Sequence, residues 1–117
     1  AYLTAAEALA RQGEAEQAME YLKPLMQKRL SSSAYQTTLD LIADMTEDEL
    51  VQEIMDERAR EFAFEGHRWY DLRRTTQPAL VRNYDGQTYT LQPAQYTMRF
   101  PSSAVSANPE IERWENQ

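Results

Sequence analysis

The first thirty residues show apolar positions at helical spacing, interrupted once by a glycine. The first stripe consists of Leu3, Ala6, Leu9 and Ala10. Gly13 follows it and is typical of a helix C-terminus. A second helix is predicted from about Glu14, with apolar residues three and four positions apart. Pro24 lies inside that helix and predicts a kink or an irregular turn. The pattern therefore predicts a helical hairpin.

This predicted hairpin resembles one tetratricopeptide repeat. The residues that fit the small, large, glycine, alanine and aromatic pattern of the repeat are Ala6, Leu9, Gly13, Ala18 and Tyr21. Repeats of this kind bury their apolar faces against neighbouring copies. Because only one copy is evident, we expect further repeats upstream and interpret the chain as part of a longer protein.

The middle of the chain contains a break and then a strong helix start. Three serines at residues 31–33 mark the break. Residues 34–45 fit either a short helix or a packed loop. Thr46 is a favourable N-cap, and Glu49 three residues later completes a capping box. This helix is predicted to run to about Glu65, where Gly66 ends it.

The last fifty residues change character and predict short elements. A short helix or turn is expected over His67–Arg74. Asp85 and Gly86 form a hairpin turn signal between possible strands at Leu80–Tyr84 and residues 88–91. Residues 96–100 read as extended, residues 102–107 as one helical turn, and the chain from Asn108 on as an extended tail or a frayed end. The whole pattern predicts a mainly α fold.

Length and charge narrow the possible functions. The chain has 117 residues, a length typical of one domain, and a net charge of −7. The acidic balance argues against binding to nucleic acid and to an anionic membrane surface. The absence of cysteine excludes disulfides, thiolate chemistry and the usual structural zinc sites. No cofactor or metal site is predicted.

The predicted central helix carries charged residues on its apolar face. The apolar residues of this face are Val51, Ile54, Met55 and Phe62. Arg58 falls in the middle of the face, with Glu65 beside it and Glu61 at its edge. An unpaired buried charge costs several kcal/mol, so these groups must be paired. Two arrangements remain open: Arg58 with either glutamate, or Arg68 or Arg73 folding back onto one of them.

These charges also have a catalytic interpretation. Glu61, Glu65 and Asp71 would act as acid and base carboxylates of a glycosidase, with His67 carrying protons. We favour a buried ion-pair network, because structural ion pairs also perturb pKa values and imitate active sites. Trp69 is interpreted as a packing residue rather than a sugar-stacking platform. Tyr70 fits either role.

Residues 57–74 resemble the signature of the SusD/RagB-like family. The matching residues are Glu57, Arg58, Glu61, Phe62, Glu65, Gly66, Arg68, Trp69, Asp71, Leu72, Arg73 and Arg74. The segments Ala6-Glu7-Ala8, Phe100-Pro101-Ser102 and Ala107-Asn108-Pro109 also fit that family. The resemblance covers nearly the whole chain.

The resemblance implies a fold and a function. The fold would be a tetratricopeptide-repeat-like helical hairpin and a capped long helix, with a small β-hairpin and an extended C-terminal tail. Residues 1–117 would form the C-terminal portion of a SusD/RagB-like domain. The family implies a non-catalytic, cell-surface lipoprotein of the outer membrane, which binds an oligosaccharide or other nutrient and delivers it to a TonB-dependent transporter. The ligand would bind upstream, and the lipid-bearing cysteine is absent from this chain.

Within the signature, we expect a structural role for a set of residues that we call the clamp. The clamp consists of Glu57, Arg58, Glu61, Glu65, Gly66, Arg68, Trp69, Asp71 and Arg73. An alternative function is a tetratricopeptide-type scaffold that binds a protein and no glycan. Tyr84 and Tyr89, near the predicted hairpin turn, form the aromatic cluster most expected at the surface, where it would contact ligand or transporter or have no role in binding.

Overall fold

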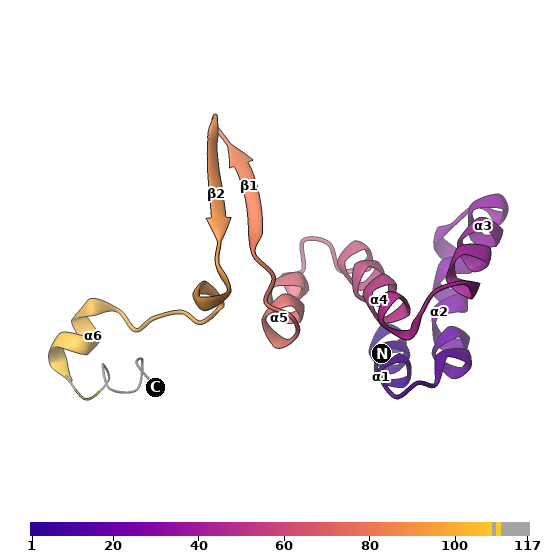
Figure 1. Ribbon diagram of the computed structural model, residues 1–117, viewed down its shortest axis with the longest axis horizontal. Coiled ribbons are helices and arrows are strands. Elements are labelled where there is room, and N and C mark those ends of the chain that lie inside the picture. Colours follow the sequence, from indigo (N-terminus) through magenta and orange to yellow (C-terminus); the bar gives the residue numbers. More distant parts are fainter. Residues whose placement is uncertain (109, 111–117) are drawn as a thin grey trace. The chain divides into compact units, whose positions relative to one another are not determined.

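The computed structural model describes residues 1–108 and residue 110 (Figure 1). The chain divides into two compact units, the first comprising residues 1–71 and the second beginning at Leu72. Within the described residues, six α-helices and one two-stranded antiparallel sheet are present. The prediction of a mainly α fold with a small β-hairpin is therefore confirmed.

The first unit begins with the predicted helical hairpin, α1 (Tyr2–Ala10) and α2 (Ala15–Arg29), which lie side by side in Figure 1. Gly13 turns the chain between them with φ +79°, a left-handed conformation that glycine adopts without steric cost. Helix α2 continues through Pro24, so of the two alternatives predicted there, a kink or an irregular turn, the irregular turn is not present.

The first unit contains two further helices that pack against this hairpin. Helix α3 (Ser32–Ala43) settles the ambiguous region after the serines, and the hydroxyl of Ser31 caps it by accepting a hydrogen bond from the Ala34 amide. Helix α4 (Glu47–Glu61) begins with the predicted capping box. The Thr46 amide donates to Oε2 of Glu49 at 2.8 Å, and the Glu49 amide donates to the Thr46 hydroxyl at 3.4 Å.

The core of the first unit lies where α1 packs against both α2 and α4, while α3 packs against α2. Its buried apolar side chains are Leu3, Ala6, Ala10, Ala18, Leu22, Met26, Ile42, Leu50 and Ile54. The small residues of α1 and α2 allow the two backbones to approach closely. This core fixes the positions of α1 and α4, which carry most of the charged network described below.

Helix α4 ends at Glu61 rather than at Glu65, which corrects the predicted boundary. Phe62 leaves the helical conformation, and Phe64 has φ +66°, which no α-helix accommodates. Gly66 also has a positive φ, and α5 (His67–Arg74) begins directly after it. The earlier turn lets α5 return toward α4, so that a carboxylate of α5 reaches a buried arginine of α4.

The second unit contains β1 (Leu80–Tyr84) and β2 (Gln87–Leu91), which form the predicted antiparallel hairpin. Asp85 and Gly86 both have positive φ, 48° and 72°, as a two-residue type I′ turn requires. The segment after β2 is not simply extended, because a short 3₁₀ helix, η1 (Pro93–Tyr96), precedes the extended residues.

Tyr96 is the buried anchor of this unit. Its side chain is fully buried, and its hydroxyl donates a hydrogen bond to the carbonyl of Pro78 at 2.8 Å. Helix α6 (Ser102–Ala107) follows where one helical turn was predicted. The prediction for the tail beyond Asn108 lies largely outside the described residues.

Candidate functional site

The signature segment centres on a buried ion pair between Arg58 of α4 and Asp71 of α5. Nε of Arg58 donates to Oδ2 of Asp71 at 3.1 Å, and Nη2 donates to Oδ1 at 3.2 Å. The Arg58 and Asp71 side chains are only 9% and 4% exposed. A third donor, Nη1 of Arg58, reaches the hydroxyl of Thr4 on α1 at 3.2 Å. The pair therefore connects α1, α4 and α5.

A second carboxylate, Glu7 of α1, completes the network. Oε1 of Glu7 accepts a hydrogen bond from Nε of Arg11 at 3.0 Å, and Oε2 lies 3.9 Å from Nε of Arg58. Two carboxylates and two guanidinium groups thus compensate one another, with Glu7, Arg58 and Asp71 buried and Arg11 at the surface. This balance offsets the cost of removing charges from water, because each buried charged group has an opposite charge nearby.

Glu7 is not among the site residues predicted from the sequence, although its position on an apolar stripe indicates that it is buried. It follows Leu3 by four positions and precedes Ala10 by three, so it lies on the apolar stripe of α1. A charged residue on such a stripe requires a partner in the core. The same reasoning identified Arg58 and applies equally to Glu7.

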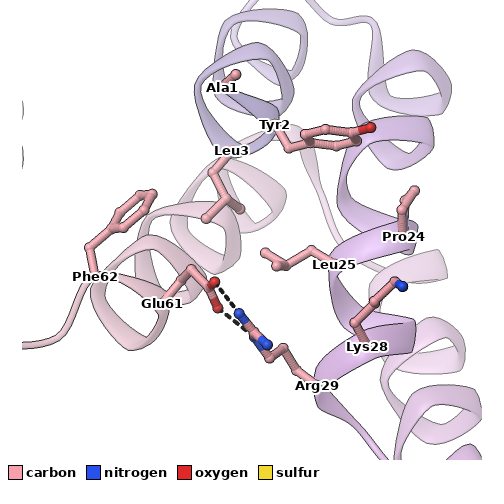
Figure 2. Close-up of a pocket in the computed structure, with 9 residues that line it drawn as sticks. All are labelled: Ala1, Tyr2, Leu3, Pro24, Leu25, Lys28, Arg29, Glu61 and Phe62. Carbon is pink, nitrogen blue, oxygen red and sulfur yellow. Dashed lines mark hydrogen bonds and ion pairs between the residues drawn. The ribbon is translucent and has the colours of Figure 1, made fainter.

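Glu61 does not pair with Arg58, which corrects one of the predicted arrangements. Its carboxylate instead accepts two hydrogen bonds from Arg29 at the end of α2, at 2.8 and 2.5 Å (Figure 2). The side-chain hydrogen bond from Arg29 is the largest effect on the Glu61 carboxyl and lowers its pKa below the ordinary value. A carboxyl held in the ionised form is a poor general acid.

Glu65 and His67 lie at the surface, which corrects the expectation that Glu65 shares the core face. The Glu65 side chain is 61% exposed, and its Oε2 is 3.9 Å from Nε2 of His67. The imidazole packs against the ring of Phe62, with ring centroids 4.8 Å apart. His67 is thus a packed surface residue beside the turn.

Arg68 does not fold back onto Glu61 or Glu65. Its Nη2 lies 3.3 Å from Oδ1 of Asp56, and its Nη1 donates to the carbonyl of Met55 at 3.3 Å. Both charged side chains of this pair are about two-fifths exposed, at 42% and 41%. The contact therefore joins α5 to α4 at the edge of the network.

The remaining clamp residues are less buried than Arg58 and Asp71. The Glu57 carboxylate accepts from Arg60 at 2.8 Å on the outer side of α4. Trp69 is half-buried, whereas Tyr70 is exposed. Arg73 is exposed in the last turn of α5.

A mainly apolar groove of about 390 Å³ lies beside the Arg29–Glu61 pair (Figure 2). Its lining residues are Ala1, Tyr2, Leu3, Pro24, Leu25, Lys28, Arg29, Glu61 and Phe62. The only carboxylate of this lining is Glu61, and it is already neutralised by Arg29. Such a groove can accept an apolar side chain, but it presents no second carboxylate for paired acid–base chemistry.

The described residues contain no group of three metal-ligating side chains close enough to hold a metal ion. Over the same residues, no helix combines the length and apolar character needed to cross a bilayer. The chemistry visible at the signature is therefore that of charge pairing between helices.

The model of the SusD family matches residues 1–115, and the chain belongs to this family. Members of the family are outer-membrane-associated lipoproteins of the cell surface that bind nutrients and glycans and act by binding rather than catalysis. A search of curated proteins found no match.

Proposed function

We propose that this chain is the C-terminal portion of a SusD-like lipoprotein that delivers an oligosaccharide or other nutrient to a TonB-dependent outer-membrane transporter. The family match over residues 1–115 supports the class of protein. The principal ligand site would lie in the upstream part of the protein, and the lipid anchor would attach it to the cell surface. The chain itself would supply the helical scaffold.

We further infer that the clamp holds this scaffold together. The single observation that supports this role is the buried pair of Arg58 and Asp71, because it joins α4 to α5 and reaches α1 through Thr4. The clamp residues closest to this pair would contribute most. Glu65 and Arg73 would contribute least, since both are exposed.

A binding role is favoured over catalysis by the partners of the candidate acids. Glu61 is held by Arg29, and Asp71 is held by Arg58. A glycosidase requires one carboxyl that can donate a proton and a second that can attack or activate water. Arg29 keeps Glu61 ionised and makes it a poor proton donor, and Asp71 is buried against Arg58, where a substrate cannot reach it.

Delivery is tested by co-expressing the protein with a TonB-dependent transporter of the same bacterium. The complex would be extracted in detergent and analysed by size-exclusion chromatography. The proposal predicts elution of both proteins together in a constant ratio. Separate elution over a range of salt and detergent conditions would contradict delivery by direct contact.

The groove of Figure 2 favours one alternative, a helical scaffold that binds a protein without any glycan. Its apolar lining and its position along α1, α2 and α4 suit an apolar side chain of a partner helix or strand. In that case a Leu25→Asp substitution would abolish partner binding, while the uptake of oligosaccharides by cells carrying the variant would remain normal.

A further inference from the structure

The β-hairpin presents two tyrosines, an arginine and a glutamine on one face. The register pairs Arg82 with Tyr89 and Tyr84 with Gln87. Side chains of directly paired residues lie on the same face of a sheet, and alternate residues along a strand share that face. Tyr84 and Tyr89 are therefore diagonal neighbours, and Arg82 and Gln87 occupy the other two corners.

This face is open to solvent. Tyr84 is 75% exposed and Tyr89 52% exposed. Only Leu80 and Leu91, at the end of the hairpin far from the turn, are half-buried. A two-stranded hairpin is only marginally stable by itself in water. The exposed tyrosine side chains are not buried in a core. The aromatic rings thus lie where a ligand can reach them.

The polar groups of the face are oriented as donors. The Tyr89 hydroxyl donates to Oε1 of Gln87 at 2.8 Å, which orients the amide of Gln87 so that its NH₂ group faces away from that bond. Among the described residues, the hydrogen bond of the Arg82 guanidinium runs from Nη1 to the carbonyl of Val81 at 3.1 Å. Arginine has five donors, so the remaining N–H groups can bind a ligand.

The opposite face of the hairpin has different chemistry. It carries Val81, Asn83, Thr88 and Thr90. The Thr88 hydroxyl donates to Oδ1 of Asn83 at 2.8 Å, so these two polar groups satisfy each other. That face has neither an aromatic ring nor a charged group.

We propose that the face formed by Arg82, Tyr84, Gln87 and Tyr89 is an oligosaccharide-contact site. The tyrosine rings provide rigid, flat surfaces on which the C–H faces of sugar rings stack, and they lose little conformational entropy on binding. Arg82 and Gln87 donate hydrogen bonds to sugar hydroxyl or acidic groups. This inference rests on the proposed function, because it places an additional ligand contact within this chain.

The size of the face favours a sugar chain over a protein partner. A strand of five residues is about 17 Å long, and two strands together are about 10 Å wide, so the face covers on the order of 200 Å². A stable protein interface needs about 800 Å² on each partner. Two or three sugar rings, by contrast, match the length of the ribbon.

The test is affinity electrophoresis of the complete chain in gels containing starch, xylan, dextran, polygalacturonate or chondroitin sulfate. Three variants would be compared with the original chain: Tyr84→Val, Tyr89→Val and Val81→Thr. Valine keeps the strand propensity of tyrosine while removing the ring. Val81 is 53% exposed on the opposite face, so Val81→Thr is matched in exposure to the Tyr89 change.

The proposal predicts retardation of the original chain by at least one polysaccharide. Each tyrosine variant should bind about tenfold more weakly, while Val81→Thr binds normally. Equal retardation of all variants would overturn the proposal by placing the contact elsewhere. Equal weakening by Val81→Thr would do the same, since the effect would then come from the hairpin fold.

A lack of retardation in every gel would also overturn this site. That outcome would leave the proposed delivery function intact, because delivery is tested separately by co-elution with the transporter. A preference for polygalacturonate and chondroitin sulfate that disappears in Arg82→Gln would assign the guanidinium to acidic sugar groups. Retention of that preference in Arg82→Gln would exclude Arg82 from the site.

Discussion

Arg58 and Asp71 are joined by two parallel hydrogen bonds in the interior of the first unit, although they belong to different helices. Bidentate pairing of a guanidinium with a carboxylate fixes both distance and orientation. The pair therefore determines where α5 lies against α4. Removing Asp71 leaves the buried Arg58 without its two close hydrogen bonds to a carboxylate, with Glu7 at 3.9 Å as the nearest other carboxylate described here.

Asp71→Asn should consequently lower the free energy of unfolding by about 3–5 kcal/mol. Urea unfolding followed by far-ultraviolet circular dichroism measures this change. Asp56→Asn is the matched control, because it weakens the exposed contact with Arg68 and should cost no more than about 1 kcal/mol. Equal losses in the two variants would contradict the clamp role of the buried pair.

Replacing both Arg58 and Asp71 provides a second test of the clamp role. The double variant Arg58→Met and Asp71→Leu removes both charges and fills similar space with apolar groups. Such replacements of buried ion pairs are often neutral or stabilising. We expect the double variant to be more stable than Asp71→Asn alone, as measured by the same urea titration. A double variant less stable than Asp71→Asn would show that Glu7 cannot tolerate the loss of Arg58.

The pair of Arg29 and Glu61 predicts a pH dependence of stability. The hydrogen bond from Arg29 lowers the pKa of Glu61 in the folded protein. The stabilising contribution of this pair is therefore present above the unfolded pKa of about 4.3 and is lost as the pH falls through the lower folded pKa. As the pH falls from the unfolded pKa of Glu61 to its folded pKa, the urea midpoints of the original chain and Glu61→Gln should converge.

Glu65→Gln serves as the control for that experiment, since Glu65 is exposed and lacks an arginine partner among the described residues. Its midpoint should follow that of the original chain at every pH. A difference between the original chain and Glu61→Gln that stays constant across the acidic range would contradict the role of ionised Glu61.

Replacing Gly66 should lower the free energy of unfolding through the backbone conformation rather than through packing. It has φ +78°, and a Cβ built on it would meet no atom within 4 Å. The cost of Gly66→Ala is therefore conformational and should be about 1–2 kcal/mol. Gly66→Asn should cost less, because asparagine adopts the left-handed region more readily. Equal losses for alanine and asparagine in urea unfolding would indicate a hidden steric contact.

The capping box at the start of α4 provides a local test. Thr46→Ala removes the hydroxyl that accepts from the Glu49 amide and should cost about 1 kcal/mol. Thr46→Ser retains the hydroxyl and should be nearly neutral. Thermal unfolding followed by circular dichroism distinguishes these outcomes, and an equal loss in both variants would argue against the cap.

Local signals in the sequence predicted most of the elements correctly. The glycine at residue 13, the capping box of Thr46 and the Asp85-Gly86 turn each act within a few residues, so their geometry follows from the backbone preferences of those residues. The ambiguous region after the serines became helical because its apolar residues pack against α2. That packing is tertiary and is not visible in the segment itself.

The partners of the charged residues were harder to predict. The helical wheel correctly predicts the burial of Arg58, but neither of the two arrangements that the sequence leaves open, Arg58 with Glu61 or Glu65 and Arg68 or Arg73 with one of these glutamates, includes Asp71, because the sequence predicts that α4 continues to Glu65. The turn after Glu61 moved Glu65 to the surface and brought Asp71 to Arg58 instead. The Arg29–Glu61 pair joins two helices distant in the sequence, and only the packing of α2 beside α4 brings them together.

The network around Arg58 also constrains the order in which the chain can fold. Helices α1 and α2 form a hairpin from neighbouring residues, whereas Arg58 reaches Thr4 across 54 positions of sequence. During synthesis from the N-terminus, Glu7 is therefore made long before Arg58 emerges. Arg11, four residues from Glu7 on the same helix, can pair with it in the meantime. Arg11 can therefore compensate the charge of Glu7 on the apolar side of the hairpin until α4 and α5 are synthesised and pack around it.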